Sequence, residues 1–311
     1  MDSCFPTVTN QAYELTYSTD WEDLVDAFGP NSSEASGDNY YEDFPEPCHG
    51  TYCSTVGPFI PGFLAIASCL GVLSNTALAI SLATRPPLWG QRHRPGRTVL
   101  SLMAAASAIF AAILPFFAVG FRHRWIFGSH FCRVARVLKS GGLFAQGLLG
   151  GGSGRAPPSW LLPTALWATG FVLATPAAVI SSPGEVCVSS QEAQLHLWSW
   201  AHGLFCLALF LFLPLVAVLA TANRRRLRCG GNLHLGITWV FYLFWAPYGV
   251  AMILDRLVQE NQLTRDCHQQ EFLDYFLGFS EALGVSHCFL CPVLILGVSS
   301  GRVAQWASSS C

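Results

Sequence analysis

The chain has 311 residues, of which 52% are hydrophobic and only 12% are charged. Soluble domains carry about 25% charged residues, so this composition excludes an ordinary soluble enzyme. The formal net charge is −2, but residues 1–56 hold 11 of the 19 carboxylates and none of the 17 lysine and arginine residues. An acidic N-terminal segment followed by a basic, apolar remainder predicts a charged partner.

The first 56 residues form an acidic segment that we expect to be largely disordered and extracellular. Its carboxylates alternate with Ser, Gly and Asn, a mixture that buries too little apolar surface to fold alone. A negative field with aromatic anchors is suited to a basic protein ligand, and Tyr40 and Tyr41 lie in an acidic setting compatible with sulfation. The alternative is a solvated tail that only confers solubility. The candidate ligand-binding residues here are Asp20, Glu22, Asp23, Asp26, Asp38, Tyr40, Tyr41, Glu42 and Asp43.

The remaining chain contains long apolar runs that predict a seven-transmembrane helix bundle. A membrane helix needs about 20 largely uncharged residues. We expect an all-α membrane protein with a bundle over 57–298 and a short cytoplasmic tail over 299–311. The run at 132–150 is the weakest span because cations lie at its head. The expected spans are 57–84, 98–121, 132–150, 160–181, 196–222, 232–255 and 270–298.

The basic residues of the predicted loops indicate the orientation. One set of loops carries ten arginines and the other set four, and the richer set lies on the cytoplasmic side of membrane proteins. This places the N-terminus outside. Asn31, followed by Ser32 and Ser33, is then a glycosylation acceptor on the lumenal side.

Cysteines on the predicted outer face lie in an oxidising compartment and are candidates for disulfide bonds. Cys132 begins a span and Cys187 lies in the next outer loop, so a bridge between them would hold that loop over the bundle. Cys267 lies in the last outer loop and could pair with Cys48, or alternatively with Cys53.

Two carboxylates interrupt the last predicted span. Asp274 and Glu281 are seven residues apart, about two helical turns, and therefore share one helix face. Intramembrane carboxylates normally face a water-filled cavity or a cation. They are candidates for the floor of an outer ligand pocket, and pairing with Arg133, Arg136 or Lys139 is almost as strong an interpretation.

The same span contains His287, Cys288 and Cys291, which we expect to pack inside the bundle rather than bind a metal. The sequence shows no phosphate-binding loop, zinc-ligand spacing or flanked nucleophile, so we predict no enzymatic activity, no cofactor, no metal and no nucleic-acid partner. A transporter whose charged residues line an ion path is a weaker alternative, because no inverted repeat is visible.

Family motifs occur at several positions. The last span has the spacing E-x5-H-C-x3-P from Glu281 to Pro292, and the sixth has the W-x-P pattern at Trp245 and Pro247. In these motifs the chain resembles the chemokine-receptor branch of the rhodopsin-like receptors. Within that branch it is similar, over nearly its whole length, to the Duffy antigen type of atypical chemokine receptor.

Three signalling elements of that branch are absent. The aspartate of the second span is replaced around Ser107, the D-R-Y triplet is reduced to Arg155, and the N-P-x-x-Y motif begins with Cys291. Between Phe144 and Pro176 the chain is also about ten residues shorter than the family's helix lengths require. Either the inner loop is short or the sequence lacks a piece of it. These departures favour a receptor that binds without signalling.

The resemblance implies a plasma-membrane receptor that binds inflammatory CC and CXC chemokines promiscuously and sequesters, internalises or transcytoses them without G-protein coupling. It also implies two outer disulfides and passage through early and recycling endosomes. The acidic segment would capture the chemokine, and a pocket around Asp274, Glu281 and Trp245 would receive its flexible N-terminus. A conventional signalling chemokine receptor is the main alternative, and association with itself or with other chemokine receptors stays open.

Overall fold

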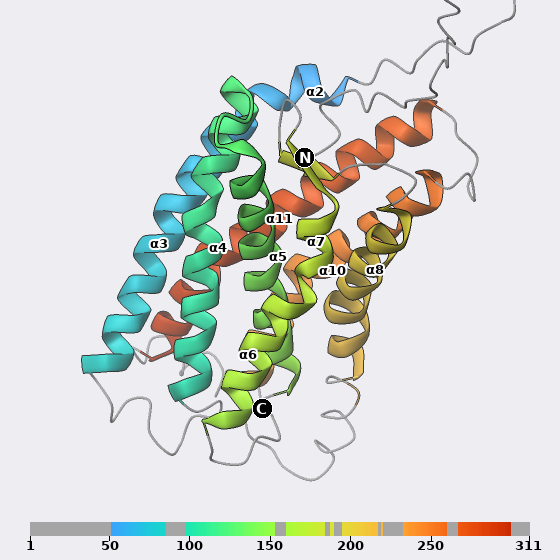
Figure 1. Ribbon diagram of the computed structural model, residues 1–311. Helices are drawn as coiled ribbons and strands as arrows, with labels where there is room; N and C mark the ends of the chain where they lie inside the picture. Colours follow the sequence, from blue (N-terminus) through green and yellow to red (C-terminus); the bar gives the residue numbers. More distant parts are fainter. Residues whose placement is uncertain are drawn as a thin grey trace, which may run out of the picture.

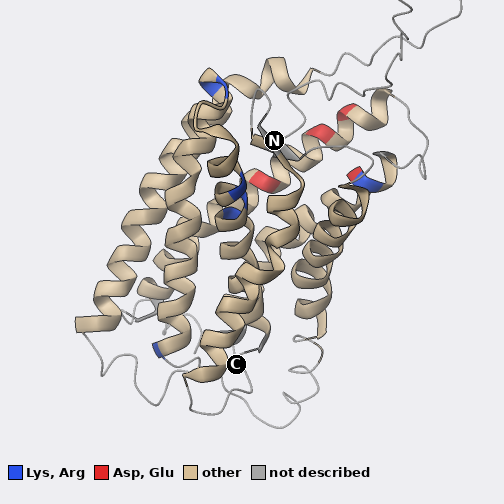
Figure 2. Cartoon of the chain, viewed as in Figure 1, with Lys and Arg blue, Asp and Glu red and all other residues tan. Residues whose placement is uncertain are grey.

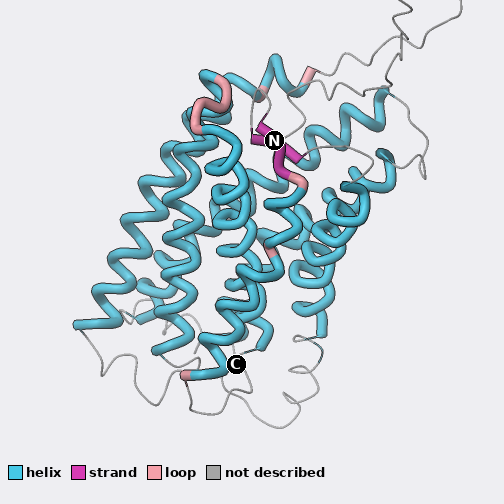
Figure 3. The backbone as a smooth tube through the Cα atoms, viewed as in Figure 1, coloured by secondary structure: helices cyan, strands magenta, loops and turns pink. Residues whose placement is uncertain are grey.

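The computed structural model describes residues 51–84, 97–152, 160–183, 187–189, 195–216, 219, 233–259 and 267–299. These ranges are helical apart from a short β-hairpin and a few connecting residues (Figure 1, Figure 3). The elements are α2 (Tyr52–Thr55), η2 (Gly57–Phe59), α3 (Ile60–Thr84), α4 (Arg97–His123), α5 (Gly128–Gly152), α6 (Leu161–Leu173), α7 (Thr175–Val179), β1 (Ser181–Pro183), β2 (Cys187–Ser189), α8 (His196–Leu207), η6 (Ala208–Phe212), α10 (Leu233–Gln259) and α11 (Cys267–Ser299).

Among the residues that the structure describes, six helical segments are long and apolar enough to cross a membrane. They are Gly57–Thr84, Arg97–His123, Leu161–Val179, His196–Val216, Gly236–Val258 and Cys267–Gly297. This confirms the prediction of an all-helical protein with multiple membrane-spanning segments. Helix α5 has 25 residues, enough to span, but its three cations lower its hydropathy below that of the other six.

The long helices lie side by side, with α5 near the centre of the bundle (Figure 1). Helix α5 contacts α4, α6, α7 and α10, while α3 packs between α4 and α11, and α8 packs on α10. We call the end of the bundle at which α2 and the β-hairpin lie the α2 end (Figure 1). This arrangement places the cations of α5 opposite the carboxylates of α11.

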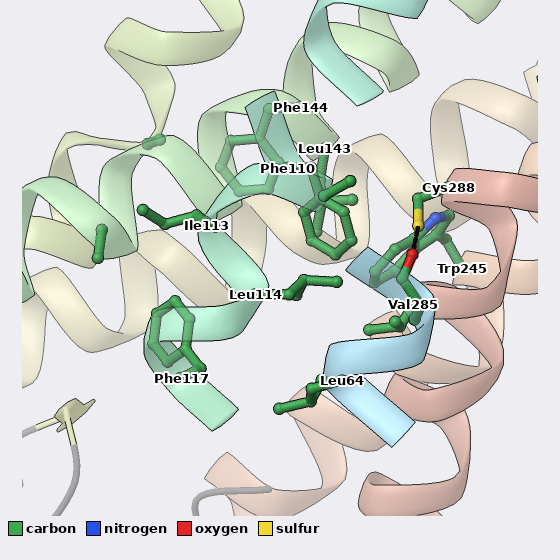
Figure 4. Packing of buried hydrophobic residues seen from close by; sticks show 14 of the residues in the cluster. Leu64, Phe110, Ile113, Leu114, Phe117, Leu143, Phe144, Trp245, Val285 and Cys288 are labelled. Carbon is green, nitrogen blue, oxygen red and sulfur yellow. Dashed lines mark hydrogen bonds between the residues drawn. The ribbon is translucent and has the colours of Figure 1, made fainter. Parts of the chain in front are cut away.

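Large side chains fill the space between the helices. The main buried cluster draws residues from α3, α4, α5, α8, α10 and α11, and Figure 4 shows its centre, where the Cys288 Sγ donates to the Ala67 carbonyl oxygen at 3.7 Å. Phe110, Phe144 and Trp245 are each at most 1% exposed. Close packing of this kind fixes the relative rotation of the helices and hence which polar residues meet.

The described residues begin at 51, within the segment over 1–56 that we expect to be largely disordered. There α2 occupies Tyr52–Thr55, and η2 leads directly into α3. Tyr52 is 3% exposed and packs against α11. Residues 1–50 lie outside the described ranges, so the boundary at 56 stays a prediction.

Candidate ligand-binding site

Charged residues of the described helices are few, and their positions gather in the half of the bundle that contains the α2 end, with Arg97 as the exception (Figure 2). Because charges within a membrane bundle are costly, such a concentration makes this half of the bundle the candidate ligand-binding region. The described charged residues are Arg97, Arg122, Arg124, Arg133, Arg136, Lys139, Asp255, Arg256, Glu271, Asp274 and Glu281.

An ion pair joins the two central charged helices. The Lys139 Nζ of α5 donates to the Glu281 Oε1 of α11 at 2.5 Å, and the two side chains are 15% and 6% exposed. The same Nζ lies 5.0 Å from the ring centroid of Phe117 on α4, a cation–π distance. Lys139 is one of the three cations that the sequence offers as partners of the α11 carboxylates. It pairs with Glu281, the carboxylate that we expect to bind ligand.

Asp274 lies two turns nearer the α2 end on the same helix. Its side chain is half-buried, and the Gln270 Nε2 donates to its Oδ1 at 3.3 Å. Of the other predicted cations, Arg133 is exposed and Arg136 is 9% exposed and engaged in contacts within the bundle. Asp274 is thus the more accessible of the two α11 carboxylates.

Trp245, expected to line the pocket, lies in the core instead. It is 1% exposed and makes edge contacts with Phe110 and Tyr248 at centroid distances of 5.9 and 5.7 Å. Its ring also covers Gly284 of α11, where a Cβ would lie 2.6 Å from the indole. In this conformation the indole is sealed from the α2 end, because rings and helix backbone surround it.

A disulfide connects the β-hairpin to α5. Cys132 and Cys187 are bonded, with their Cα atoms 5.5 Å apart, and both are buried. The hairpin pairs Ser181 with Ser189 and Pro183 with Cys187, so the bond holds it against the bundle at the α2 end. Cys53 and Cys267 each take part in a disulfide bond. Cys48 lies outside the described residues, so the predicted pairing of Cys267 with Cys48, or alternatively with Cys53, stays a prediction.

The base of the N-terminal segment is attached to α11 by residues that the sequence analysis did not single out. The Thr51 backbone N–H donates to the Glu271 Oε1 at 3.2 Å, its hydroxyl contacts the same oxygen, and it lies 3.0 Å from the Tyr275 hydroxyl. Tyr52 packs edge-on against Tyr275 with a centroid distance of 5.1 Å. Burial raises the pKa of Tyr52 to about 12, so its phenol stays neutral at physiological pH.

A second polar region lies deeper, toward the opposite end. The Asn75 Nδ2 of α3 donates to the Cys288 carbonyl oxygen at 2.8 Å and to the Ser107 Oγ at 3.3 Å, and Ser107 donates to the same carbonyl at 3.2 Å. These bonds join α3, α4 and α11. A small cavity beside them is lined by Asn75, Leu78, Met103, Ala104, Ser107, Gln146, His287, Cys291, Pro292 and Ile295.

His287 and its neighbours pack within the bundle. His287 is 1% exposed, and its ring lies 5.3 Å edge-on from Phe241 and 6.0 Å from Phe244. Cys288 contacts α3 through its sulfur. Within the ranges that the structure describes, no three His, Cys, Asp or Glu side chains converge in a way that could hold a metal ion.

The predicted capture residues of the acidic segment lie outside the described residues, and so does the glycosylation site. They are Asp20, Glu22, Asp23, Asp26, Asn31, Asp38, Tyr40, Tyr41, Glu42 and Asp43. The short tail over 299–311 lies outside them apart from residue 299. These assignments stay predictions.

The relatives of the chain decide its family. It is 30% identical over 296 residues to atypical chemokine receptor 1 of Homo sapiens, an alignment that covers 91% of this chain and 86% of that protein. The chain belongs to the atypical chemokine receptor family. It is also 31% identical over 261 residues to the same receptor of Saimiri boliviensis boliviensis, covering 80% of this chain and 76% of that protein.

A more distant relative gives the same result. Identity to atypical chemokine receptor 1 of Bos taurus is 28% over 280 residues, covering 84% of this chain and 83% of that protein. No family model matches the chain. Membership of an atypical chemokine receptor family confirms the resemblance read from the motifs, and it confirms that this is a receptor rather than an enzyme.

Proposed function

We propose that this chain is a non-signalling receptor that binds inflammatory CC and CXC chemokines promiscuously and sequesters, internalises or transcytoses them without coupling to a G protein. The observation that carries the proposal is the alignment with human atypical chemokine receptor 1 over 91% of the chain. The 11 carboxylates of residues 1–56, among which there is no lysine or arginine, support it, because a basic protein is recognised by complementary negative charge.

The proposal places seven helices across the plasma membrane with the N-terminus outside. Helix α5 is the third span, since cations are tolerated in a membrane helix when they face the protein interior. Lys139 pairs with Glu281 and Arg136 is 9% exposed, so both side chains are sheltered from lipid. The arginine-rich loops then face the cytoplasm, and the acidic segment faces the medium.

Capture by the acidic segment is the first step. The 11 carboxylates of residues 1–56 create a negative field immediately before α2, and such a field raises the association rate of a basic ligand. Sulfation of Tyr40 or Tyr41 would strengthen it. Because the contacts are charged and solvated, their contribution falls as salt rises.

Entry of the flexible ligand N-terminus into the bundle is the second step. Asp274 is half-buried and lies nearer the α2 end, so it meets an incoming cation first. Glu281 is already paired with Lys139, so a ligand ammonium that reaches it competes with Lys139 for the carboxylate. Trp245 is 1% exposed and would contact ligand only after α10 and α11 separate.

The opposite end lacks the groups that signalling members of the resembled branch use. Ser107 stands at the position of the second-span aspartate, Cys291 at that of the N-P-x-x-Y asparagine, and Arg155 alone is left of the D-R-Y triplet. Ligand binding is therefore expected to lead to uptake through endosomes and not to nucleotide exchange. Association with itself or with other chemokine receptors is compatible with this role.

The test is binding of labelled CC and CXC chemokines to cells that express the full chain or a variant lacking residues 1–47. We expect both subclasses to bind, with strong salt sensitivity, and most of the binding to be lost in the truncated variant. A G-protein activation assay on the same cells should give no signal. Chemokine-evoked nucleotide exchange would instead indicate a conventional receptor, and ion flux without chemokine binding would indicate a transporter.

A further inference from the structure

Two residues that precede the first span, Thr51 and Tyr52, contact the last helix, α11. Cys53, next to Tyr52, and Cys267, four residues before Glu271, also take part in disulfide bonds. The attachment consists of Thr51 and Tyr52 on the N-terminal side and Glu271, Tyr275 and Gly278 on α11, and we call it the α2 clamp. We propose that the α2 clamp positions the acidic segment over the bundle and thereby sets ligand affinity without touching the ligand. This inference rests on the proposed function, since it concerns the same ligand.

Hydrogen bonds form the outer part of the clamp. Thr51 directs both its backbone N–H and its hydroxyl to one carboxylate oxygen of Glu271. The hydroxyl has a single proton, so the Tyr275 hydroxyl, 3.0 Å away, is the donor to the Thr51 Oγ1. Bonds to an ionised acceptor are stronger than neutral ones, and together these three contacts hold the chain at one residue.

A close fit forms the inner part. The ring of Tyr52 is 3% exposed and stands at 83° to the ring of Tyr275. Its phenol covers Gly278, where an added Cβ would overlap the hydroxyl oxygen. Glu271, Tyr275 and Gly278 follow one another at intervals of four and three residues, which places them on one face of α11. Only glycine leaves room for the tyrosine on that face.

The position of the clamp gives it a role in binding. Thr51 lies five residues after Glu46, the last carboxylate of the acidic segment. Tyr52 lies eight residues before Ile60, where α3 begins. The α2 clamp also fixes the segment to the helix that bears Asp274 and Glu281. The clamp thus joins the two acidic regions that the proposed function assigns to the ligand.

Fixing this point affects affinity through geometry rather than contact. When two binding elements are linked, the strength of the second contact depends on the effective concentration that the linkage imposes. If the acidic segment is held at residues 51 and 52, it loses less conformational entropy on ligand binding than if it is held only where α3 begins. Release of the clamp should therefore weaken ligand binding while the helices stay packed, because α2 has only four residues and lies outside the main buried cluster.

Two variants release the clamp in different ways. Gly278→Ala forces Tyr52 out of its site, and Thr51→Val removes the hydroxyl but keeps the backbone N–H. Gly62→Ala is the matched control, since a Cβ there meets nothing within 4 Å. Binding of a labelled basic chemokine is measured on intact cells, with receptor number counted through an N-terminal epitope tag. We expect both release variants to lose roughly fivefold or more in affinity and the control to match the wild type.

A second measurement separates positioning from general stability. Gly278→Ala is repeated in a receptor that carries Asp20→Asn and Asp26→Asn. If the clamp acts through the acidic segment, the loss caused by Gly278→Ala is smaller in that background, because coupled sites are not additive. Equal losses in both backgrounds would overturn the inference. Should Gly278→Ala fail to reach the cell surface, Thr51→Val is used in the same cycle.

The outcomes distinguish the inference from the function on which it rests. A wild-type receptor that binds no CC or CXC chemokine overturns the proposed function. A wild-type receptor that binds, with Thr51→Val and Gly278→Ala both equal to Gly62→Ala, overturns the inference alone.

Discussion

Lys139 and Glu281 form an ion pair that joins α5 to α11 beneath the α2 end, with the lysine also resting on the ring of Phe117. Breaking a buried ion pair by removing one partner costs about 3–5 kcal/mol. We therefore expect Lys139→Met to lower the thermal unfolding midpoint of the detergent-solubilised receptor strongly.

The double variant Lys139→Met with Glu281→Leu is the control for this prediction. It removes both charges and replaces them with apolar side chains of similar volume, a change that is often neutral or stabilising. Its midpoint should recover most of the loss. A double variant that is less stable than Lys139→Met alone would mean that the pair is not the reason for the single variant's instability.

The Cys132–Cys187 bond is expected to stabilise the β-hairpin over the bundle. A disulfide contributes about 2–4 kcal/mol, so Cys132→Ala should lower the unfolding midpoint and the amount of receptor at the cell surface. Cys187→Ala and the double variant should match it, because all three remove the same bond. If the double variant were much worse than either single one, the two cysteines would have roles beyond their mutual bond.

Much of the fold follows from apolar run length. The spans expected at 57–84 and 98–121 correspond to helical segments Gly57–Thr84 and Arg97–His123, because lipid requires backbone polarity to be satisfied within each helix. The run at 132–150 is part of α5, Gly128–Gly152. Its cations made it the weakest prediction, and packing between neighbouring helices accommodates two of them, Arg136 and Lys139.

The contacts within the candidate site were less predictable. The sequence offered Arg133, Arg136 and Lys139 as partners of Glu281, and spacing alone does not select among residues that share one helix face. The rotation of α5 against α11 selects Lys139. Trp245 of α10 is enclosed by Phe110 and Gly284. A motif identifies this residue but does not reveal its exposure.

Local sequence gave no indication of α2. A helix of four residues has no stability of its own, and it exists here because Thr51 and Tyr52 contact residues more than 200 positions away on α11. The sequence alone does not show why residue 278 is glycine. The reason is the ring of Tyr52, which occupies the space that a Cβ at this position would need.

The contact between Gly284 and Trp245 predicts a packing effect. A Cβ at Gly284 would lie 2.6 Å from the Cε3 and Cζ3 atoms of the indole, and overpacking of a core costs about 1–3 kcal/mol. Gly284→Ala should therefore lower the unfolding midpoint. Gly236→Ala on α10, where a Cβ meets nothing within 4 Å, should be unchanged or slightly more stable, since alanine favours a helix. Equal midpoints for the two variants would contradict the tight packing of Trp245.

The small cavity beside Asn75 predicts insensitivity to sodium. Its lining includes Ser107, Gln146 and His287 but no carboxylate, so nothing there compensates a bound cation in a low-dielectric interior. The unfolding midpoint of the wild type should be the same in sodium chloride and in choline chloride at equal ionic strength. Ser107→Asp adds a carboxylate next to the Asn75 amide, and this variant should become more stable in sodium, by about 1.4 kcal/mol at a concentration tenfold above its dissociation constant. A wild-type midpoint that rises with sodium would show that the neutral lining suffices for cation binding, and a Ser107→Asp variant without any response would show that the cavity does not admit the ion.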